Sequence, residues 1–236
     1  YTESITNSGG IYGDIDLFRE TSYNRVLEDT WVGCYEGIKR CNIVLDNIES
    51  VQMDETTKKK YKGEMLFIRA LTYFNMVRLW GDVPLVIRYF DDPFQTFGIG
   101  RSPVNDVYEQ IKNDLIEASK ILPEVPDNKR LGTAVSGSAK TLLGKVYLTL
   151  KDYDNAVKIL KEVIDSQQYT FIQDYTELFD VDNKNNSESI FEIQYTEAVT
   201  DLGSAFANLF APIGSSEVTG GIGATEGNNE PTQNFY

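Results

Sequence analysis

The side chains that most often perform catalysis are unevenly supplied in this sequence, because none of its 236 residues is a histidine. Ser-His and Cys-His nucleophile pairs and the common zinc sites all use an imidazole ring. Carboxylates are abundant, with 36 Asp and Glu residues. Glycoside hydrolysis needs two carboxylates about 5 to 10 Å apart across a cleft, and the spacing singles out no such pair. The missing histidine therefore removes these mechanisms, whereas a hydrolase that uses two carboxylates stays open.

Two short motifs resemble cofactor or metal sites, but each lacks a residue that the chemistry requires. GGIGATEG at 220–227 contains Gly-x-Gly, yet Glu226 stands where a dinucleotide-binding loop has its third glycine. DVDNKNNSES at 180–189 begins like a calcium loop, yet Lys184 and Asn185 replace an acceptor and a glycine. We expect no cofactor and no metal, and we interpret 180–189 as a solvated loop.

Charge and hydropathy restrict the partners further. The net charge of −14 disfavours nucleic acid phosphates and anionic lipid. The sequence contains no run of 18 apolar residues and no start of the signal-peptide type. Cys34 and Cys41 lie seven positions apart in one predicted helix, about 10.5 Å of rise, which is too far for a disulfide. We interpret them as core residues or free thiols.

Aromatic rings and short polar side chains occur together in two stretches without a helical period, 11–24 and 201–236. A sugar offers C–H faces that stack on rings and hydroxyls that need polar partners. The second stretch has no Lys or Arg, as expected of an exposed loop rich in glycine. Our candidate ligand-binding residues are Tyr12, Arg19, Tyr23, Asn24, Phe206, Asn208, Phe210 and Asn228. Packing of the rings against the scaffold is the structural alternative.

Helices must position these loops, and apolar residues recur at helical spacing in five segments. The predicted helices are 31–48, 54–80, 103–122, 137–150 and 153–165. The apolar face of the second is expected to run along Tyr61, Met65, Phe67, Ile68, Leu71, Phe74 and Leu79. Asp54 is expected to cap the second helix and Pro103 to open the third. An extended exit at 83–90 and a loop at 91–102 separate these two helices, and short strands are expected near 187–195.

The last two helices fit the tetratricopeptide pattern of a helical hairpin. The matching residues are Leu143, Gly144, Tyr147, Ala156 and Leu160, whereas Lys140 departs from the pattern. Gly144 and Ala156 are small where two helices would cross closely, and larger residues fill the space beside the crossing. Such repeats mostly bind or scaffold other molecules.

Charged and large aromatic residues of the first two helices have a structural interpretation. We expect Glu64 and Arg69 to form ion pairs or to extend from the edge of a packed helix. Asp82 is assigned a structural role as well. Trp31 and Trp80 occupy apolar positions and are expected in the core.

Four groups of residues, in successive parts of the chain, carry a more specific resemblance. They are Trp31, Tyr35, Arg40, Asn42 and Leu45; Gly63, Glu64, Phe67, Arg69, Ala70, Tyr73 and Phe74 followed by WGDVPL at 80–85; Arg101, Pro103, Val104, Val107 and Tyr108; and SESIFEI at 187–193. In this order they resemble the helices, exit and strand of the SusD/RagB family, the surface glycan-binding lipoproteins of Bacteroidetes.

The resemblance implies a mainly α fold of tetratricopeptide-like hairpins with a loop-rich face and a few short strands. It implies one domain over 1–236, with a ligand face at 1–24 and 196–236, that forms the N-terminal portion of a longer protein. Its implied function is to capture an oligosaccharide or another nutrient, without catalysis, and to deliver it to a SusC-like TonB-dependent transporter. It further implies a lipid anchor, absent from this stretch, on the extracellular face of the outer membrane.

Two other classes of function remain open. A helical scaffold for a protein or peptide partner would need only the repeats. A glycoside hydrolase would need a carboxylate pair that the sequence does not single out. Oligosaccharide binding without turnover separates the glycan-binding module from the hydrolase, and partner binding without glycan binding would indicate the scaffold.

Overall fold

The structure is a computed structural model that describes residues 5, 6, 14, 15, 19, 21–126, 130–180, 182–195, 230 and 231. Its elements, with η for a short 3-10 helix, are β1 (Ile5–Thr6), α2 (Arg25–Asn47), η1 (Ile48–Ser50), α3 (Glu55–Trp80), η2 (Pro93–Thr96), α4 (Val104–Ile121), α5 (Ser136–Thr149), α6 (Tyr153–Asp165), η3 (Tyr175–Phe179) and β2 (Glu230–Pro231). The predicted mainly α fold is confirmed.

The chain divides into two compact units, residues 1–32 with 194–236 and residues 33–193. In the first unit, β1 and β2 pair antiparallel, with Ile5 opposite Pro231. α2 begins in the first unit and continues into the second. The expectation of one domain over 1–236 stays a prediction.

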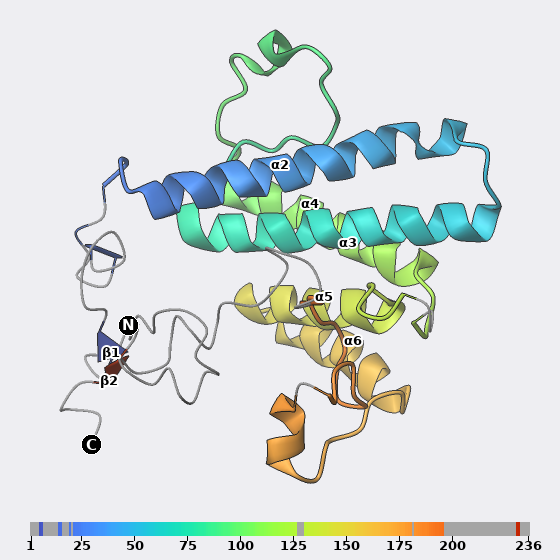
Figure 1. The fold of residues 1–236 in the computed structure, drawn as a ribbon. Helices are drawn as coiled ribbons and strands as arrows, with labels where there is room; N and C mark the ends of the chain where they lie inside the picture. Colours follow the sequence, from blue (N-terminus) through green and yellow to red (C-terminus); the bar gives the residue numbers. More distant parts are fainter. Residues whose placement is uncertain are drawn as a thin grey trace. The chain divides into compact units, whose positions relative to one another are not determined.

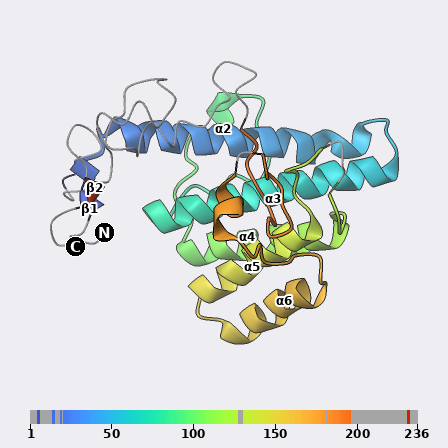
Figure 2. The same cartoon turned by 60° about the horizontal axis from the view of Figure 1, so that its bottom comes forward.

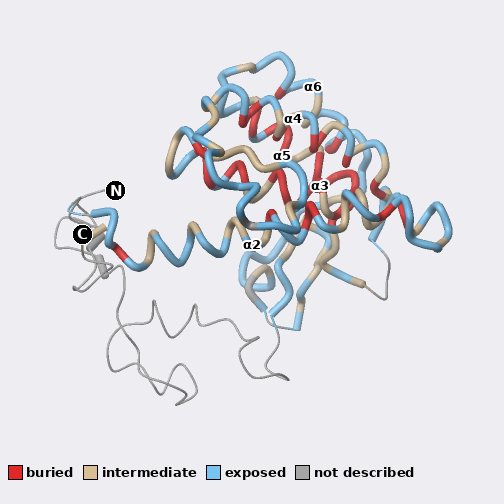
Figure 3. The backbone as a smooth tube through the Cα atoms, turned by 90° about the horizontal axis from the view of Figure 1, so that it is seen from above, coloured by how far each residue is buried: buried red, intermediate tan, exposed pale blue. Residues whose placement is uncertain are grey.

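Successive helices of the second unit pack against each other in chain order, α3 on α4, α4 on α5 and α5 on α6 (Figures 1 and 2). The second-unit part of α2 runs beside α3, on the side away from α6 (Figure 1). Buried residues concentrate where α3, α4 and α5 meet (Figure 3). This stack of hairpins matches the predicted tetratricopeptide-like arrangement. Among the described residues, no helix combines the length and the apolarity needed to cross a bilayer.

α3 provides the largest share of the core because it has helical neighbours on more than one side. Its buried apolar residues are Leu66, Phe67, Ala70, Tyr73, Phe74, Met76 and Val77. Ile68 and Leu79, which we assigned to its apolar face, are 38% and 64% exposed. That part of the prediction was wrong. Trp31 and Trp80, predicted in the core, are half-buried.

The ends of α3 and α4 follow from local chemistry. The Asp54 carboxylate accepts a hydrogen bond from the Thr57 backbone N–H at 2.9 Å, as predicted for a helix cap. α3 stops at Gly81, whose φ of +68° favours glycine. Pro103 immediately precedes α4, and the Asp82 carboxylate accepts from the Val104 N–H at 2.9 Å. The structural interpretation of Asp82 is therefore confirmed.

The hairpin of α5 and α6 lies within one residue of its predicted bounds. A methyl group added at Gly144 would lie 2.5 Å from Leu160 Cγ, so a larger residue would require Leu160 or the helices to shift. Ala156, the other small residue of the pattern, is fully buried. Cys34 and Cys41 are free thiols, as expected.

The short strand predicted near 187–195 is absent, because these residues form turns and irregular structure. Thr170 and Ser187 exchange a backbone bond of 2.9 Å and a side-chain bond of 3.2 Å, and no ladder continues from them. The Phe191 ring instead packs edge-on against Phe67 of α3, with ring centroids 4.9 Å apart. The alternating pattern therefore reflects one-sided packing of a loop on a helix.

Candidate functional site

Three of the eight predicted ligand residues lie in the described part of the first unit. Tyr23 precedes α2 and is 90% exposed, so its ring is available for stacking. Asn24 is buried, and its Oδ1 accepts from the Val26 N–H at 3.0 Å, which makes it the cap of α2. Arg19 is exposed and pairs with Asp14 at 3.5 Å. The other five, Tyr12, Phe206, Asn208, Phe210 and Asn228, lie outside the described residues.

A cavity of about 290 Å³ in the second unit has the mixed lining that sugars require, and we call it the loop cavity. Two segments, 125–135 and 168–192, surround it. Its apolar lining residues include Val125, Pro126, Leu131, Val135, Ile190 and Phe191, and its polar ones include Thr133, Gln168, Tyr169, Asn185, Asn186, Ser187, Ser189 and Glu192. Its volume lies at the lower end of the range for ligand pockets.

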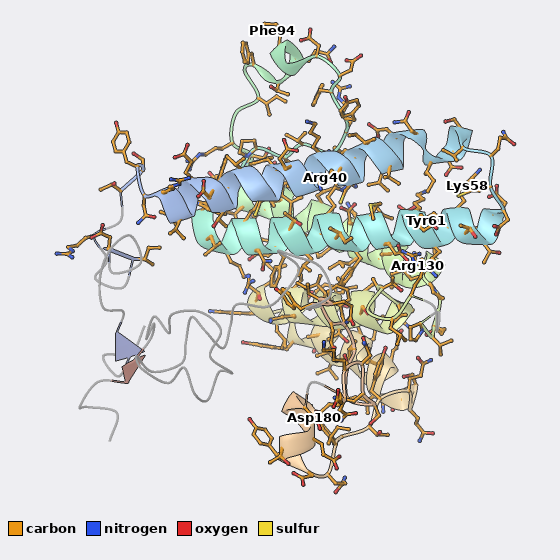
Figure 4. The ribbon with its side chains drawn as sticks, viewed as in Figure 1. Arg40, Lys58, Tyr61, Phe94, Arg130 and Asp180 are labelled. Carbon is orange, nitrogen blue, oxygen red and sulfur yellow. The ribbon has the colours of Figure 1, made fainter. Side chains whose placement is uncertain are left out.

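Contacts with the helices hold the two segments of the loop cavity in place. Arg130 donates to both carboxylate oxygens of Glu64 on α3, at 3.2 and 3.1 Å. Its guanidinium also lies 5.2 Å from the centroid of the Tyr61 ring, beneath α3 in Figure 4. On the other segment, the Ser138 hydroxyl of α5 donates to the Ile190 carbonyl at 2.9 Å.

The ring of Tyr169 closes one side of the loop cavity over Gly137, where any side chain would overlap its hydroxyl group. Burial raises the pKa of the Tyr169 hydroxyl, and the Glu124 carboxylate adds to this rise. The phenol therefore stays neutral at physiological pH and can both donate and accept hydrogen bonds.

Two carboxylates at or beside the loop cavity are engaged in structural bonds. Glu192 is the only carboxylate among its lining residues, and both its oxygens accept from the Asn185 N–H at 3.2 Å. Glu64 is buried and paired with Arg130. A single carboxylate does not suffice for the usual two-carboxylate cleavage of a glycosidic bond. In the described part of the chain, no group of three potential ligands is placed to hold a metal ion.

A second exposed feature, which sequence reasoning did not select, is a pair of phenylalanines at the tip of residues 83–102, the exit loop. Phe94 and Phe97 are 71% and 74% exposed, and their rings meet edge-to-face at 5.3 Å. We call this pair the aromatic tip. It projects beyond α2, on the side away from α5 and α6 (Figures 1 and 4). Its sequence signal was a Phe-x-x-Phe spacing within a polar loop.

Buried polar residues fix the base of the exit loop. Val83 and Ser102 form an antiparallel bridge that closes the loop. The Tyr73 hydroxyl accepts from the Val86 N–H at 2.7 Å and donates to the Val86 carbonyl at 3.0 Å. Asn42 of α2 donates to the same carbonyl at 3.0 Å. The loop is therefore anchored to both α2 and α3.

Arg69 completes this anchor from inside the core, where it is buried. It donates to the Asp114 carboxylate of α4, to Asn42 Oδ1 at 2.8 Å and to the Ile87 carbonyl at 3.1 Å. We predicted that Arg69 and Glu64 each form an ion pair, and this is confirmed. Arg69 pairs with Asp114 and Glu64 pairs with Arg130, and both Arg69 and Glu64 are buried.

The stacked hairpins with anchored loops define a tetratricopeptide-like scaffold. A family of SusD-like proteins, described as "Starch-binding associating with outer membrane", matches residues 11–148, more than half of the chain. The chain belongs to this SusD-like family. Its structural neighbours are SusD-like proteins as well.

Individual relatives agree with this assignment. A SusD-like protein of Bacteroides ovatus is 30% identical over 234 residues, covering 89% of this chain and 40% of that protein. The starch-binding protein SusD of Bacteroides thetaiotaomicron is 29% identical over 163 residues, covering 66% and 28%. A solved laminarin-binding SusD-like protein superposes with a TM-score of 0.83 at 28% identity, covering 99% and 55%. The chain thus spans about half or less of the length of these relatives.

Proposed function

We propose that this chain is part of a cell-surface protein that binds an oligosaccharide without cleaving it. Membership of the SusD-like family carries the proposal, because relatives of that family are described as binding starch and laminarin. The exposed Tyr23 ring and the mixed lining of the loop cavity support it, since sugars combine apolar faces with hydroxyl groups. The engaged carboxylates Glu64 and Glu192 support binding over hydrolysis.

The same proposal places the protein on the extracellular face of the outer membrane, held by a lipid anchor outside this stretch. A captured glycan would pass to a SusC-like TonB-dependent transporter. The family description, which names the outer membrane, supports this location. The predicted ligand face at 1–24 and 196–236 stays part of the proposal.

Titration calorimetry against a panel of neutral oligosaccharides tests the function. We expect dissociation constants between about 1 μM and 1 mM, because a shallow site must offset the freedom lost by a flexible sugar. We expect at least one of the three substitutions Tyr12→Ala, Tyr23→Ala and Phe210→Ala to lower the affinity for oligosaccharide. Lys151→Ala and Asp154→Ala on the hairpin, both exposed, should leave affinity unchanged.

The titrations use both this chain and the protein extended to the length of its relatives, because the remaining residues are expected to contribute to the site. Product analysis after long incubation should find intact oligosaccharide. Two results together would show that the loops do not capture the ligand. They are unchanged oligosaccharide affinity in all three ring variants and loss of binding in a hairpin variant.

The aromatic tip supports a second candidate function, contact with a partner protein. Phe94 and Phe97 form an exposed pair of rings, and aromatic residues are enriched in protein interfaces. Replacing both by serine should lower capture of the transporter and leave oligosaccharide affinity unchanged. Equal transporter capture by the doubly substituted protein would remove this function from the tip.

A further inference from the structure

The second unit, residues 33–193, contains another cavity of about 360 Å³, which opens between α4, α5 and α6. It shares no lining residue with the loop cavity or with the predicted ligand loops. It is lined by Ile116, Ser119 and Lys120 of α4, Lys140, Leu143 and Tyr147 of α5, and Asn155, Lys158, Ile159 and Glu162 of α6. We call it the lysine groove.

The charge of the lysine groove is opposite to that of the chain. Lys140 pairs with Glu162 across the hairpin at 3.4 Å, so these two charges offset each other. Lys120 and Lys158 approach the groove from α4 and α6, and no ion pair to either is formed within the described part of the chain. Both lysines are exposed, and neither ammonium group has a paired carboxylate among the described residues, in a chain of net charge −14. An anion that enters the groove would be attracted by these positive charges.

The rest of the lysine groove suits a ring compound with hydroxyl groups. Ile116, Leu143 and Ile159 provide apolar surface, and the half-buried Tyr147 adds an aromatic ring. The Ser119 hydroxyl donates to the Ile116 carbonyl at 2.9 Å and retains its acceptor capacity. The groove thus combines apolar contact, a hydrogen-bond acceptor and positive charge.

We propose that the lysine groove binds a carboxylate-bearing sugar, as found in oligosaccharides that contain uronic acids. Lys120 and Lys158 would receive the carboxylate, while the sugar ring lies on the apolar surface beside Tyr147. The inference rests on the proposed function in taking a carbohydrate as ligand. The volume fits a small ligand rather than an extended acidic peptide.

Calorimetric titration with a galacturonic acid trisaccharide, compared with the neutral galactose trisaccharide, tests the proposal. The acidic sugar should bind at least tenfold more tightly, since hydrogen bonds between charged groups are stronger than neutral ones. Lys120→Gln and Lys158→Gln should each lower its affinity about three- to tenfold. Raising the salt concentration from 50 to 500 mM should also weaken the binding of the acidic trisaccharide to the unchanged chain. Lys145→Gln is the matched control, because Lys145 is exposed on α5 outside the groove.

Several outcomes would overturn the inference. These are equal affinity for the two trisaccharides, an affinity unchanged by the double Lys120→Gln and Lys158→Gln substitution, or an equal loss in Lys145→Gln. Binding of an oligoglutamate peptide with the same lysine dependence, in the absence of trisaccharide binding, would also overturn it. Binding of neutral oligosaccharides by the double variant tests the proposed function separately. If the unchanged chain binds neutral sugars but not the acidic trisaccharide, only the lysine groove proposal fails.

Discussion

Arg69 and Asp114 form a bidentate ion pair inside the second unit, with Nη2 2.7 Å from Oδ1 and Nε 2.8 Å from Oδ2. Both side chains are buried. Burial alone lowers the pKa of the Arg69 guanidinium, but the hydrogen bonds and charge of Asp114 outweigh burial and raise it. Since Arg69 also reaches Asn42 and Ile87, one side chain joins α2, α3, α4 and the exit loop.

Removing Asp114 should therefore destabilise the protein strongly. Asp114→Ala leaves a buried guanidinium without its counter-charge, and we expect a loss of about 3 to 5 kcal/mol in unfolding free energy. Combining Arg69→Met with Asp114→Leu should recover much of this loss, because no buried charge remains. Urea unfolding measures both. Glu109→Ala on α4 is the control, because it removes an ion pair between Lys112 and the exposed Glu109 side chain. This change should cost less than about 1 kcal/mol of unfolding free energy. Similar losses for Asp114→Ala and Glu109→Ala would contradict the prediction.

The crossing of α5 and α6 should not accept a larger residue at Gly144. Gly144→Leu should cost about 1 to 3 kcal/mol or more, because Leu160 already fills the space. Leu160→Ala in the same protein should return part of that stability. Gly33→Ala in α2 is the control, since nothing lies within 4 Å of its added methyl group and alanine favours helix. An unchanged melting temperature in Gly144→Leu would place the crossing elsewhere.

Stability should decline at alkaline pH because of Tyr73. Burial raises the pKa of its hydroxyl from 10.0 to about 12. The unfolded chain loses this proton near pH 10, whereas the folded protein keeps it to about pH 12. The contribution to stability is thus complete below pH 10 and is lost as pH rises through 12. Unfolding free energies at pH 8, 10 and 11 measure the decline, which should be shallower in Tyr73→Phe. If the unfolding free energy falls with pH equally steeply in the unchanged chain and in Tyr73→Phe, the decline is due to other groups.

Asn24 offers a test that separates capping from ligand binding. Asn24→Ala should lower the unfolding free energy by about 1 kcal/mol, since the Val26 N–H loses its acceptor. Asn24→Asp keeps the acceptor and should restore that stability. If Asn24 acts only as a cap, calorimetry should give equal oligosaccharide affinities for Asn24→Asp and the unchanged chain. Lower affinity at equal stability would return Asn24 to the ligand site.

Helix positions and local caps were accessible from the sequence because both depend on nearby residues. The apolar period located α5 and α6, and Asp54 was identifiable from its place before an apolar run. The buried face of α3 was less accessible. With neighbours on more than one side, its buried residues do not form a single stripe, so Ile68 and Leu79 were misassigned.

The anchor of the exit loop was beyond sequence reasoning for a different reason. Arg69 and Asp114 lie 45 positions apart on different helices. Their pairing depends on where α3 crosses α4, which the pattern of neither helix specifies. By contrast, the signal that Asn24 caps α2 was present in the sequence, because asparagine before a helical period is a usual cap. The loop composition favoured a ligand role instead.

The bridge between Val83 and Ser102 also makes the exit loop replaceable. The chain leaves and re-enters the scaffold at one point, and its base is held by residues of α2 and α3 that do not depend on the tip. Closure entropy grows slowly with length, so doubling the loop would cost only about 0.6 kcal/mol. Segments of other lengths and compositions could therefore occupy 91–100 while the helices keep their sequence. This position suits both natural diversification and the grafting of a chosen recognition peptide.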